Sequence, residues 1–236
     1  QRQWTINAWT TRLGWAVDTR NDYLLPTRGM LNRLQAEIAL PGSDLEYYRL
    51  SYDFEWYLPL TRWMVLKTGI SLGYGDSYGE THDKLCYQRN IHGAIVPSTG
   101  VTCGLPFFKN FYAGGPGSVR GYSANTLGPN IDFGGRLQPL GGAVKTTGTF
   151  EFYFPQLLGN VGGGTRVSAF LDYGYVFARP GDFGFNKFRV STGLALQWQS
   201  PVGPISISYA IPFDVGHDGG FEDEIERLQF TFGNQQ

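Results

Sequence analysis

The chain has 236 residues and a formal charge of −1; charged residues make up 17% of it, aromatic residues 16%, and glycine fills 33 positions. A near-neutral chain without a run of Lys or Arg disfavours a nucleic-acid-binding protein, which would carry a basic patch. No stretch approaches the run of about 18 apolar residues that a transmembrane helix needs, although a closed β-barrel crosses a membrane without one. Few charges, many aromatic residues and many glycines favour a single all-β unit with an apolar outer face and tight turns.

Nine segments of the chain alternate apolar and polar residues with a period of two, which predicts β-strands. The clearest is Val190 to Gln199, where Leu194, Leu196 and Trp198 share one face. The first segment alternates less regularly, so we expect a β-bulge in it. In chain order, the nine predicted strands are Trp4–Asp18, Arg33–Leu40, Tyr47–Leu58, Trp63–Tyr74, Thr147–Phe154, Arg166–Phe177, Val190–Gln199, Ile205–Phe213 and Glu226–Phe232.

The connections between these strands alternate in length. Short turns at Leu25 to Gly29, Pro59 to Arg62 and Ser200 to Pro204 interleave with longer connections, above all Gly75 to Ala143. Alternation alone fits a soluble barrel equally well. One tight rim, one elaborate rim and aromatic residues at strand ends are, however, typical of barrels with short periplasmic turns and long extracellular loops. We therefore predict an antiparallel transmembrane β-barrel, integral to the bacterial outer membrane.

The odd number of predicted strands indicates that this barrel is incomplete. A barrel from a single bacterial chain normally has an even number of strands, and an odd set would leave two open edges in lipid. We therefore expect further N-terminal strands, and we expect Gln1 and Gln236 to lie at opposite rims. Because the sequence begins with Gln1 rather than Met, we also expect a processed chain or a fragment.

The long connection contains Arg120 within the glycine-rich stretch FYAGGPGSVRGY, which runs from Phe111 to Tyr122. Loops of this length are generally functional or disordered, and the aromatic run Phe107 to Tyr112 predicts that this one packs into the barrel lumen. Arg120 would then need an anion, and alternation places Glu151 and Asp172 on the inward faces of the next two strands. Charge-assisted hydrogen bonds to both predict that Arg120 pins the loop to the wall; the alternative is a solvated surface arginine.

The two cysteines, Cys86 and Cys103, lie in one polar segment of the long connection without CxxC spacing. We predict that they form a disulfide in an oxidising compartment. The alternatives are two free thiols, or a metal site that uses His82 or His92.

The three histidines, His82, His92 and His217, fall in predicted loops, and none lies beside a plausible Ser and Asp constellation. We therefore predict that the protein is not an enzyme. The segment Gly115 to Ser118 superficially suggests a phosphate loop, but it lacks the Lys-Ser/Thr of that motif and a following helix. We predict no metal and no cofactor. Candidate calcium ligands lack the spaced ligand pattern and are expected to be solvated loop acids: Asp76, Asp83, Asp218 and Glu222 to Glu224.

The segment Phe111 to Pro129, FYAGGPGSVRGYSANTLGP, resembles the sixth-extracellular-loop signature of the BamA family of outer-membrane β-barrel assembly factors. The family's VRG(F/Y) motif corresponds to Val119, Arg120, Gly121 and Tyr122. Other segments resemble the family in the same order, so that nearly the whole chain is covered. They are Asp18–Arg20 with Pro26–Gly29, Pro41–Asp44, Phe170–Gly174 and Gly193–Phe213.

The resemblance implies a sixteen-stranded barrel preceded by periplasmic POTRA domains, of which residues 1–236 form the C-terminal nine strands, with a long loop at about 75–143. It implies that Glu151 and Asp172 are the acidic partners of the loop arginine. It further implies assembly and insertion of other β-barrel proteins by β-augmentation at a lateral seam between the first and last strands. The last strand, one lip of the seam, carries Glu226, Leu228, Phe230 and Phe232.

The partners implied by the resemblance are nascent outer-membrane β-barrel proteins, accessory assembly lipoproteins and outer-membrane lipid. The tail Asn234 to Gln236 departs from the aromatic ending of many barrel proteins. TamA-like assembly proteins and two-partner-secretion transporters share the loop motif, but Asn125 to Pro129 and the turn Pro41 to Asp44 favour the BamA family. A passive porin is an alternative of another class, and a loop that fills the lumen opposes it.

Overall fold

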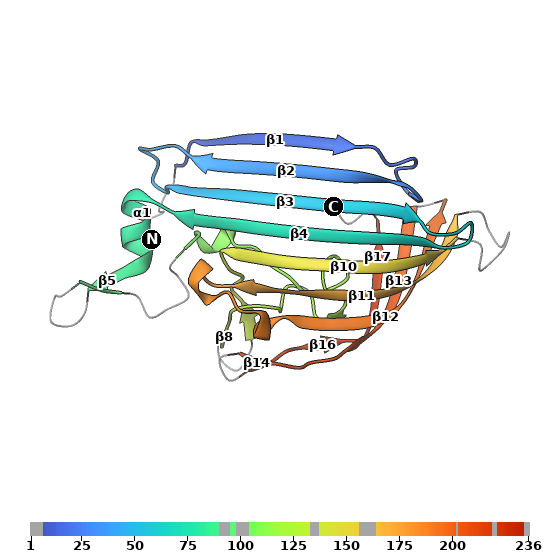
Figure 1. The fold of residues 1–236 in the computed structure, drawn as a ribbon. Coiled ribbons are helices and arrows are strands. Elements are labelled where there is room, and N and C mark those ends of the chain that lie inside the picture. Colours follow the sequence, from blue (N-terminus) through green and yellow to red (C-terminus); the bar gives the residue numbers. More distant parts are fainter. Residues whose placement is uncertain are drawn as a thin grey trace.

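The computed structural model describes residues 7–89, 95–97, 104–132, 137–155, 164–201, 203–218 and 221–233. Its centre is one antiparallel sheet of nine strands that follow one another in chain order (Figure 1). Across the sheet these strands are β1 (Thr10–Asp18), β2 (Gly29–Ala39), β3 (Tyr47–Pro59), β4 (Val65–Ser77), β10 (Val144–Phe154), β11 (Thr165–Phe177), β12 (Arg189–Ser200), β13 (Gly203–Pro212) and β17 (Leu228–Phe232).

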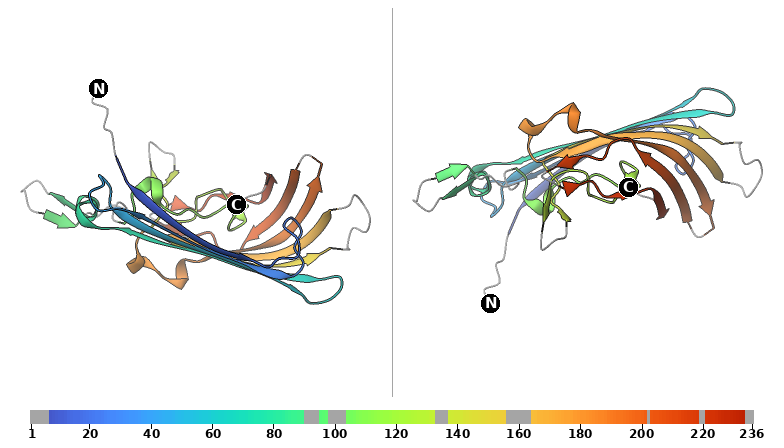
Figure 2. Two further views of the ribbon diagram at one scale, coloured as in Figure 1. Left: turned by 90° about the horizontal axis from the view of Figure 1, so that it is seen from above. Right: turned by 90° about the horizontal axis from the view of Figure 1, so that it is seen from below.

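The sheet is curved, and β1 and β17 are its two edges. Figure 2 shows that the later part of the connection between β4 and β10 lies over the concave face, whereas its first part lies at the end of the strands. Because the number of antiparallel strands is odd, β1 begins at one rim and β17 ends at the other; Gln1 and Gln236 themselves lie outside the described residues. The nine strands of the sheet agree with the nine predicted, whereas a total of sixteen stays a prediction for the complete barrel.

Most of the large apolar side chains of the sheet point away from the concave face and are exposed. Leu194 on β12 is 61% exposed, whereas the adjacent Ala195, which faces the concave side, is 3% exposed. The same alternation places Ser208 of β13 and Asp172 of β11 inside, both buried. A soluble β-protein would distribute these side chains the other way round, so this pattern indicates lipid outside and a polar lumen inside. Large exposed side chains on the last five strands are Phe150, Phe152, Leu171, Leu194, Leu196, Trp198, Ile207, Tyr209, Ile211, Leu228, Phe230 and Phe232.

Several strand boundaries differ from the predicted ones: β1 begins at Thr10 rather than Trp4, β4 ends at Ser77 rather than Tyr74, and β10 begins at Val144 rather than Thr147. The bulge expected in the first strand was wrong for its paired part, since β1 pairs with β2 in continuous register from Thr10 to Asp18.

Two further boundaries differ for local reasons. β2 begins at Gly29 rather than Arg33, because the usual polarity of the faces is reversed there. Leu31 faces the lumen and is buried, while Asn32 faces outward and accepts a hydrogen bond from the Tyr52 hydroxyl at 3.0 Å. β17 begins at Leu228, and Glu226 lies instead in the two-residue strand β16 (Ile225–Glu226), which pairs with the long connection.

The connection between β4 and β10 contains several short elements that the sequence pattern did not predict. Its helix α1 (Gly79–Cys86) is polar and only 8 residues long, too short to show a clear helical repeat in the sequence. None of the described helices is long and apolar enough to span a membrane. The elements of this connection are α1 (Gly79–Cys86), β5 (Tyr87–Arg89), β6 (Ile95–Pro97), η1 (Phe107–Lys109), β7 (Gly121–Tyr122), β8 (Asn130–Asp132) and β9 (Leu137–Pro139).

Other connections carry η2 (Pro180–Asp182) and η3 (Phe185–Lys187) between β11 and β12. The hairpin strands β14 (His217–Asp218) and β15 (Phe221–Glu222) precede β16 between β13 and β17. Cys86 ends α1, whereas Cys103 and His92 lie outside the described residues, so the disulfide stays a prediction.

Phe111 fastens the start of the glycine-rich stretch to the concave face. Its ring occupies the space above Gly73 of β4, where an added Cβ would lie 2.6 Å from the ring, and the Arg49 guanidinium stacks on it at 4.2 Å. Phe107 and Phe108, however, are 70% and 52% exposed, so the prediction that the whole aromatic run packs into the lumen was wrong for these two. Their 3-10 turn is tied to the wall through Lys109, whose Nζ donates to Glu37 Oε1 at 2.7 Å, but the two phenylalanine rings pack edge to face against each other.

Candidate functional site

The glycine-rich stretch forms a tight turn that directs Arg120 toward the wall. The backbone N–H of Ser118 donates to the Gly115 carbonyl at 3.1 Å, and the Ser118 hydroxyl accepts from the Gly114 N–H at 2.8 Å. Gly121, directly after the arginine, has φ +92°, a conformation that strains any residue with a side chain. A Cβ at Gly121 would also lie 3.0 Å from the Cβ of Ala210 on β13. Glycine is therefore required for the loop backbone to approach the wall this closely.

Arg120 lies between Glu151 of β10 and Asp172 of β11, as the alternation of those strands predicted. Its Nε donates to Asp172 Oδ2 at 2.7 Å, its Nη2 to Asp172 Oδ1 at 2.9 Å, and its backbone N–H also reaches Oδ2 at 3.1 Å. Its Nη1 donates to Glu151 Oε1 at 3.2 Å. The guanidinium carbon stands 3.4 Å from the centre of the Phe170 ring. One planar cation thus joins the loop to two adjacent strands.

Neighbouring side chains complete the hydrogen bonds of both carboxylates. The Ser168 hydroxyl donates to Glu151 Oε1 at 2.5 Å and the Tyr153 hydroxyl to Oε2 at 3.0 Å. The Thr149 hydroxyl donates to Asp172 Oδ1 at 2.6 Å. Because Arg120, both carboxylates, Ser168 and Tyr153 are buried and only Thr149 is partly exposed, the cluster resembles a satisfied buried network rather than a surface ion pair.

The charge of Arg120 is fixed in this setting. Burial by itself would lower the pKa of the guanidinium, but the carboxylates of Glu151 and Asp172 outweigh burial and raise its pKa above the ordinary value. The arginine therefore holds the loop at every physiological pH. The alternative prediction, that Arg120 is a solvated surface arginine, does not fit a residue that is only 9% exposed.

Gly121 and Tyr122 attach the loop to the segment that leads into the last strand. They form β7, which pairs with β16 so that Tyr122 lies opposite Ile225 and Gly121 opposite Glu226. Tyr122 is fully buried, and its hydroxyl donates to the Asp214 carbonyl at 2.6 Å. Burial and the nearby carboxylate of Asp223 raise the pKa of Tyr122 to about 12, so the hydroxyl keeps its proton. Glu226 thus helps to hold the loop and lies outside the sheet.

A second buried ion pair, between Arg189 of β12 and Asp223, holds the connection from β13 to β17. The Arg189 Nε donates to Asp223 Oδ2, and the Gly216 backbone N–H donates to the same oxygen at 2.8 Å. Both charged side chains are 5% exposed. The expectation that the acids at Glu222 to Glu224 are simply solvated was therefore wrong for Asp223. Charge alternation cannot show this, because the partner is more than thirty residues away in the chain.

Asp223→Asn should lower the free energy of unfolding by about 1.5 kcal/mol, because an amide keeps an acceptor oxygen but removes the charge that balances Arg189. Equilibrium unfolding in guanidinium of the full-length protein in detergent micelles measures the change. Glu224→Gln is the matched control, since Glu224 is exposed and adjacent in sequence. Equal midpoints for Asp223→Asn and wild type would show that the pair contributes nothing.

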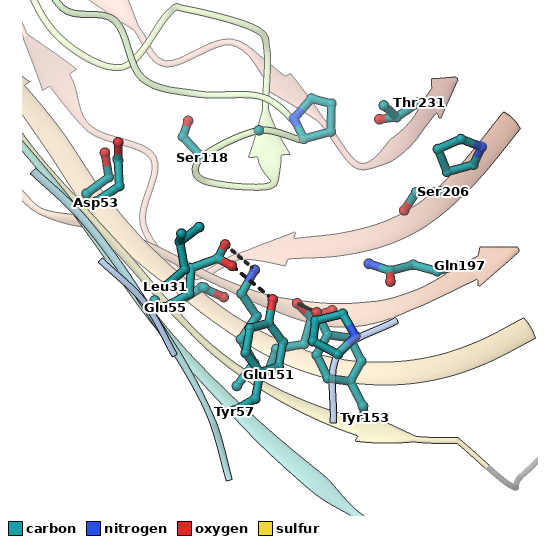
Figure 3. A pocket seen from close by; sticks show the side chains of 18 of the residues that line it. Leu31, Asp53, Glu55, Tyr57, Ser118, Glu151, Tyr153, Gln197, Ser206 and Thr231 are labelled. Atoms are coloured by element: carbon teal, nitrogen blue, oxygen red, sulfur yellow. Dashed lines mark hydrogen bonds and ion pairs between the residues drawn. The ribbon is translucent and has the colours of Figure 1, made fainter. Parts of the chain in front are cut away.

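Beneath the loop, the lumen holds a polar cavity of about 800 Å³ (Figure 3). The Lys67 Nζ forms an ion pair with Glu55 Oε1 at 3.0 Å, and the Arg166 Nε donates a hydrogen bond to Gln197 Oε1 at 2.7 Å. Charges of both signs therefore line the wall; Lys67 and Glu55 pair with each other, whereas Arg166 takes a neutral partner. Among the described residues no group of three or more His, Cys, Asp or Glu side chains is placed to hold a metal ion.

A curved antiparallel sheet with an apolar outer face, a polar lumen and a long loop pinned inside it defines this chain as part of an outer-membrane β-barrel. The family model described as "Omp85 superfamily domain" matches residues 2–235, and the chain belongs to the Omp85 superfamily.

Two relatives of this chain are named for assembly. "Outer membrane protein assembly factor BamA" of Neisseria meningitidis is 34% identical, with 94% of this chain and 28% of the relative covered. "Sorting and assembly machinery component 50 homolog" of Bos taurus is 31% identical over 59% of this chain and 24% of that protein. The crystal structure of BamA from Haemophilus ducreyi lacking POTRA domains 1–3 superposes with a TM-score of 0.73, 28% identity, and coverage of 94% of this chain and 41% of that one. The chain thus spans less than a third of the length of these curated relatives.

Sequence reasoning missed several residues that complete the site. The alternation that places Glu151 and Asp172 inward also places Tyr153 and Ser168 there, but the pattern assigns them no role, and Asp223 was predicted to be solvated. Gln229, an inward polar residue between outward apolar neighbours on the last strand, could have been singled out by that alternation.

Proposed function

We propose that the full-length protein that carries this chain assembles β-barrel proteins and inserts them into the outer membrane. The observation that carries the proposal is the edge strand β17, which ends the sheet beside a pinned loop. The names of the relatives at 34% and 31% identity support the same activity.

The last strand is the most weakly held in its half of the sheet. β17 pairs with β13 over 5 residue positions, from Tyr209 opposite Leu228 to Ile205 opposite Phe232, whereas β12 pairs with β13 over 10. An edge strand offers backbone N–H and C=O groups to which another strand can add. A client strand that pairs with β17 would place its own apolar face in lipid beside Leu228, Phe230 and Phe232. This step is an exchange of hydrogen bonds and requires no covalent chemistry.

In this account β17 is one lip of a lateral seam, and the first strand of the complete barrel is the other. The partners are nascent outer-membrane β-barrel proteins, outer-membrane lipid and accessory assembly lipoproteins, and the complete protein carries further strands and periplasmic POTRA domains before this region. The pinned loop keeps the wall rigid near the seam while the seam strand exchanges partners. The protein is proposed to be neither an enzyme nor dependent on a cofactor.

Reconstitution into liposomes tests the proposal against a polypeptide transporter and a passive porin. We expect the full-length protein to accelerate folding of an added outer-membrane β-barrel protein, seen as a heat-modifiable band on gels, and to show little steady conductance in planar bilayers. Liposomes that contain a passive porin are the control. Large steady conductance without accelerated folding would contradict the proposal, and export of an unfolded polypeptide without insertion would favour a transporter.

A further inference from the structure

Gln229 lies in the middle of β17 and points into the lumen, opposite Ser208 of β13. It is 2% exposed, whereas the flanking Leu228 and Phe230 face outward. A buried amide without hydrogen-bond partners is costly. The Gln229 side chain is therefore expected to have partners inside the lumen.

Both ends of the Gln229 side chain bind the backbone of the loop motif. Its Oε1 accepts a hydrogen bond from the Gly121 N–H at 3.3 Å, and its Nε2 donates to the Tyr122 carbonyl at 2.8 Å. The primary amide therefore acts like a peptide group, since it supplies one acceptor and one donor to a strand-like stretch of loop. No charged side chain of similar size offers both, and an apolar one would leave two buried backbone groups without partners.

The loop backbone that Gln229 binds is held independently of β17. Arg120, immediately before Gly121, is fixed to β10 and β11 through Glu151 and Asp172. Tyr122 is held by the Asp214 carbonyl. The side chain of Gln229 therefore links the edge strand to a rigid point in the lumen, in addition to the 5 positions that pair with β13.

We propose that Gln229 is a positioning residue that latches the last strand to the loop motif and so limits how readily β17 separates from the barrel. Opening of the seam then requires that the two hydrogen bonds of Gln229 break, so the loop motif controls the strand on which a client would grow. This inference rests on the proposed function for its biological meaning, but the latch itself is a property of the free protein. The loop motif then has two contacts: Arg120 binds the wall, and the backbone of Gly121 and Tyr122 binds the last strand through Gln229.

Hydrogen exchange followed by mass spectrometry on the full-length protein in lipid nanodiscs tests the latch without any client. In Gln229→Ala we expect exchange of the peptide spanning 225–233 to accelerate about 25-fold, because two hydrogen bonds are lost and each is worth about a factor of five. Gln229→Glu should accelerate it about fivefold, since a carboxylate still accepts from the Gly121 N–H but cannot donate to the Tyr122 carbonyl. Thr231→Val, on the same face two residues further on, is the matched control and should leave exchange unchanged.

The location of the effect separates a latch from general stabilisation. Peptides from β10 to β12 should exchange as in wild type in both Gln229 variants, and the variants should remain heat-modifiable. Unchanged exchange at 225–233, or equal acceleration throughout the barrel, would overturn the proposal.

A second arm measures insertion of an outer-membrane β-barrel protein by the same variants. The latch predicts that Gln229→Ala changes the insertion rate at least threefold relative to Thr231→Val, at equal folded fraction; equal rates would overturn the coupling to insertion. If wild type itself inserts no client, the proposed function fails, while the exchange result still decides whether the latch exists.

Discussion

Arg120→Ala should lower the free energy of unfolding by about 3–5 kcal/mol, the largest single effect that we expect in this chain. The change removes the cation between Glu151 and Asp172, which are 3% and 0% exposed, and leaves two buried carboxylates without the charge that balances both of them. Because neither carboxylate can be reached easily by water, screening will not soften the loss as it would at a surface. Equilibrium unfolding of the full-length protein in guanidinium, followed by tryptophan fluorescence in detergent micelles, measures the change.

Two further variants distinguish the charge of Arg120 from its shape. Arg120→Lys keeps the charge but cannot reach both carboxylates with a planar fork, so we expect an intermediate loss. Combining Arg120→Ala with Asp172→Asn should cost less than the sum of the single changes, because the groups belong to one network. An unchanged unfolding midpoint in Arg120→Ala would show that the arginine does not hold the loop.

Ile207→Arg should destabilise the barrel by about 2–4 kcal/mol, the cost of an arginine on the lipid face near the middle of a transmembrane strand. Ile207 lies near the centre of β13 and faces outward between Leu196 and Phe230 of the neighbouring strands. The measurement is the same unfolding experiment, performed in lipid bilayers so that the apolar surroundings are present.

Ser206→Arg is the matched control for Ile207→Arg. Ser206 precedes Ile207 on the same strand, but it lines the polar cavity of the lumen, where a long cationic side chain can be solvated. We expect a loss below about 1 kcal/mol there, since surface-like substitutions are usually mild. If the Ser206 variant were the more damaging of the two, the assignment of the two faces of the sheet would be reversed.

The faces of the strands could be predicted from sequence because the side chains of a strand alternate strictly. A shift of one residue would turn every side chain to the other face, so a pattern such as that around Glu151 and Asp172 fixes which residues face the lumen. The start of β2 was predicted four residues too late, because the inward-facing Leu31 interrupts the alternation of apolar and polar residues there. Alternation alone could not assign the apolar face to lipid; the alternating lengths of the connections favoured that assignment, and the exposure of this face in the structure agrees with it.

The contacts of the loop could not be predicted in the same way, because they join residues far apart in sequence and follow no local period. Phe111 fits above a glycine of β4 while the similar Phe107 stays exposed, and no pattern in the aromatic run separates them. Asp223 looks like its exposed neighbours until Arg189 is placed beside it. The role of Gln229 becomes visible only when the backbone of Gly121, more than a hundred residues away in the chain, is placed beside it.

Site-specific photocrosslinking from β17 to a newly made outer-membrane β-barrel protein tests the central claim most directly. A photoreactive amino acid is placed in turn at Leu228, Phe230 and Phe232 of the full-length protein, and at Leu194 and Leu196 of β12 as lipid-facing controls away from the edge. We predict crosslinks to the client from β17 and none from β12. No crosslink at any position of β17, or equal crosslinking from β12, would contradict an insertase that works through the edge of its last strand.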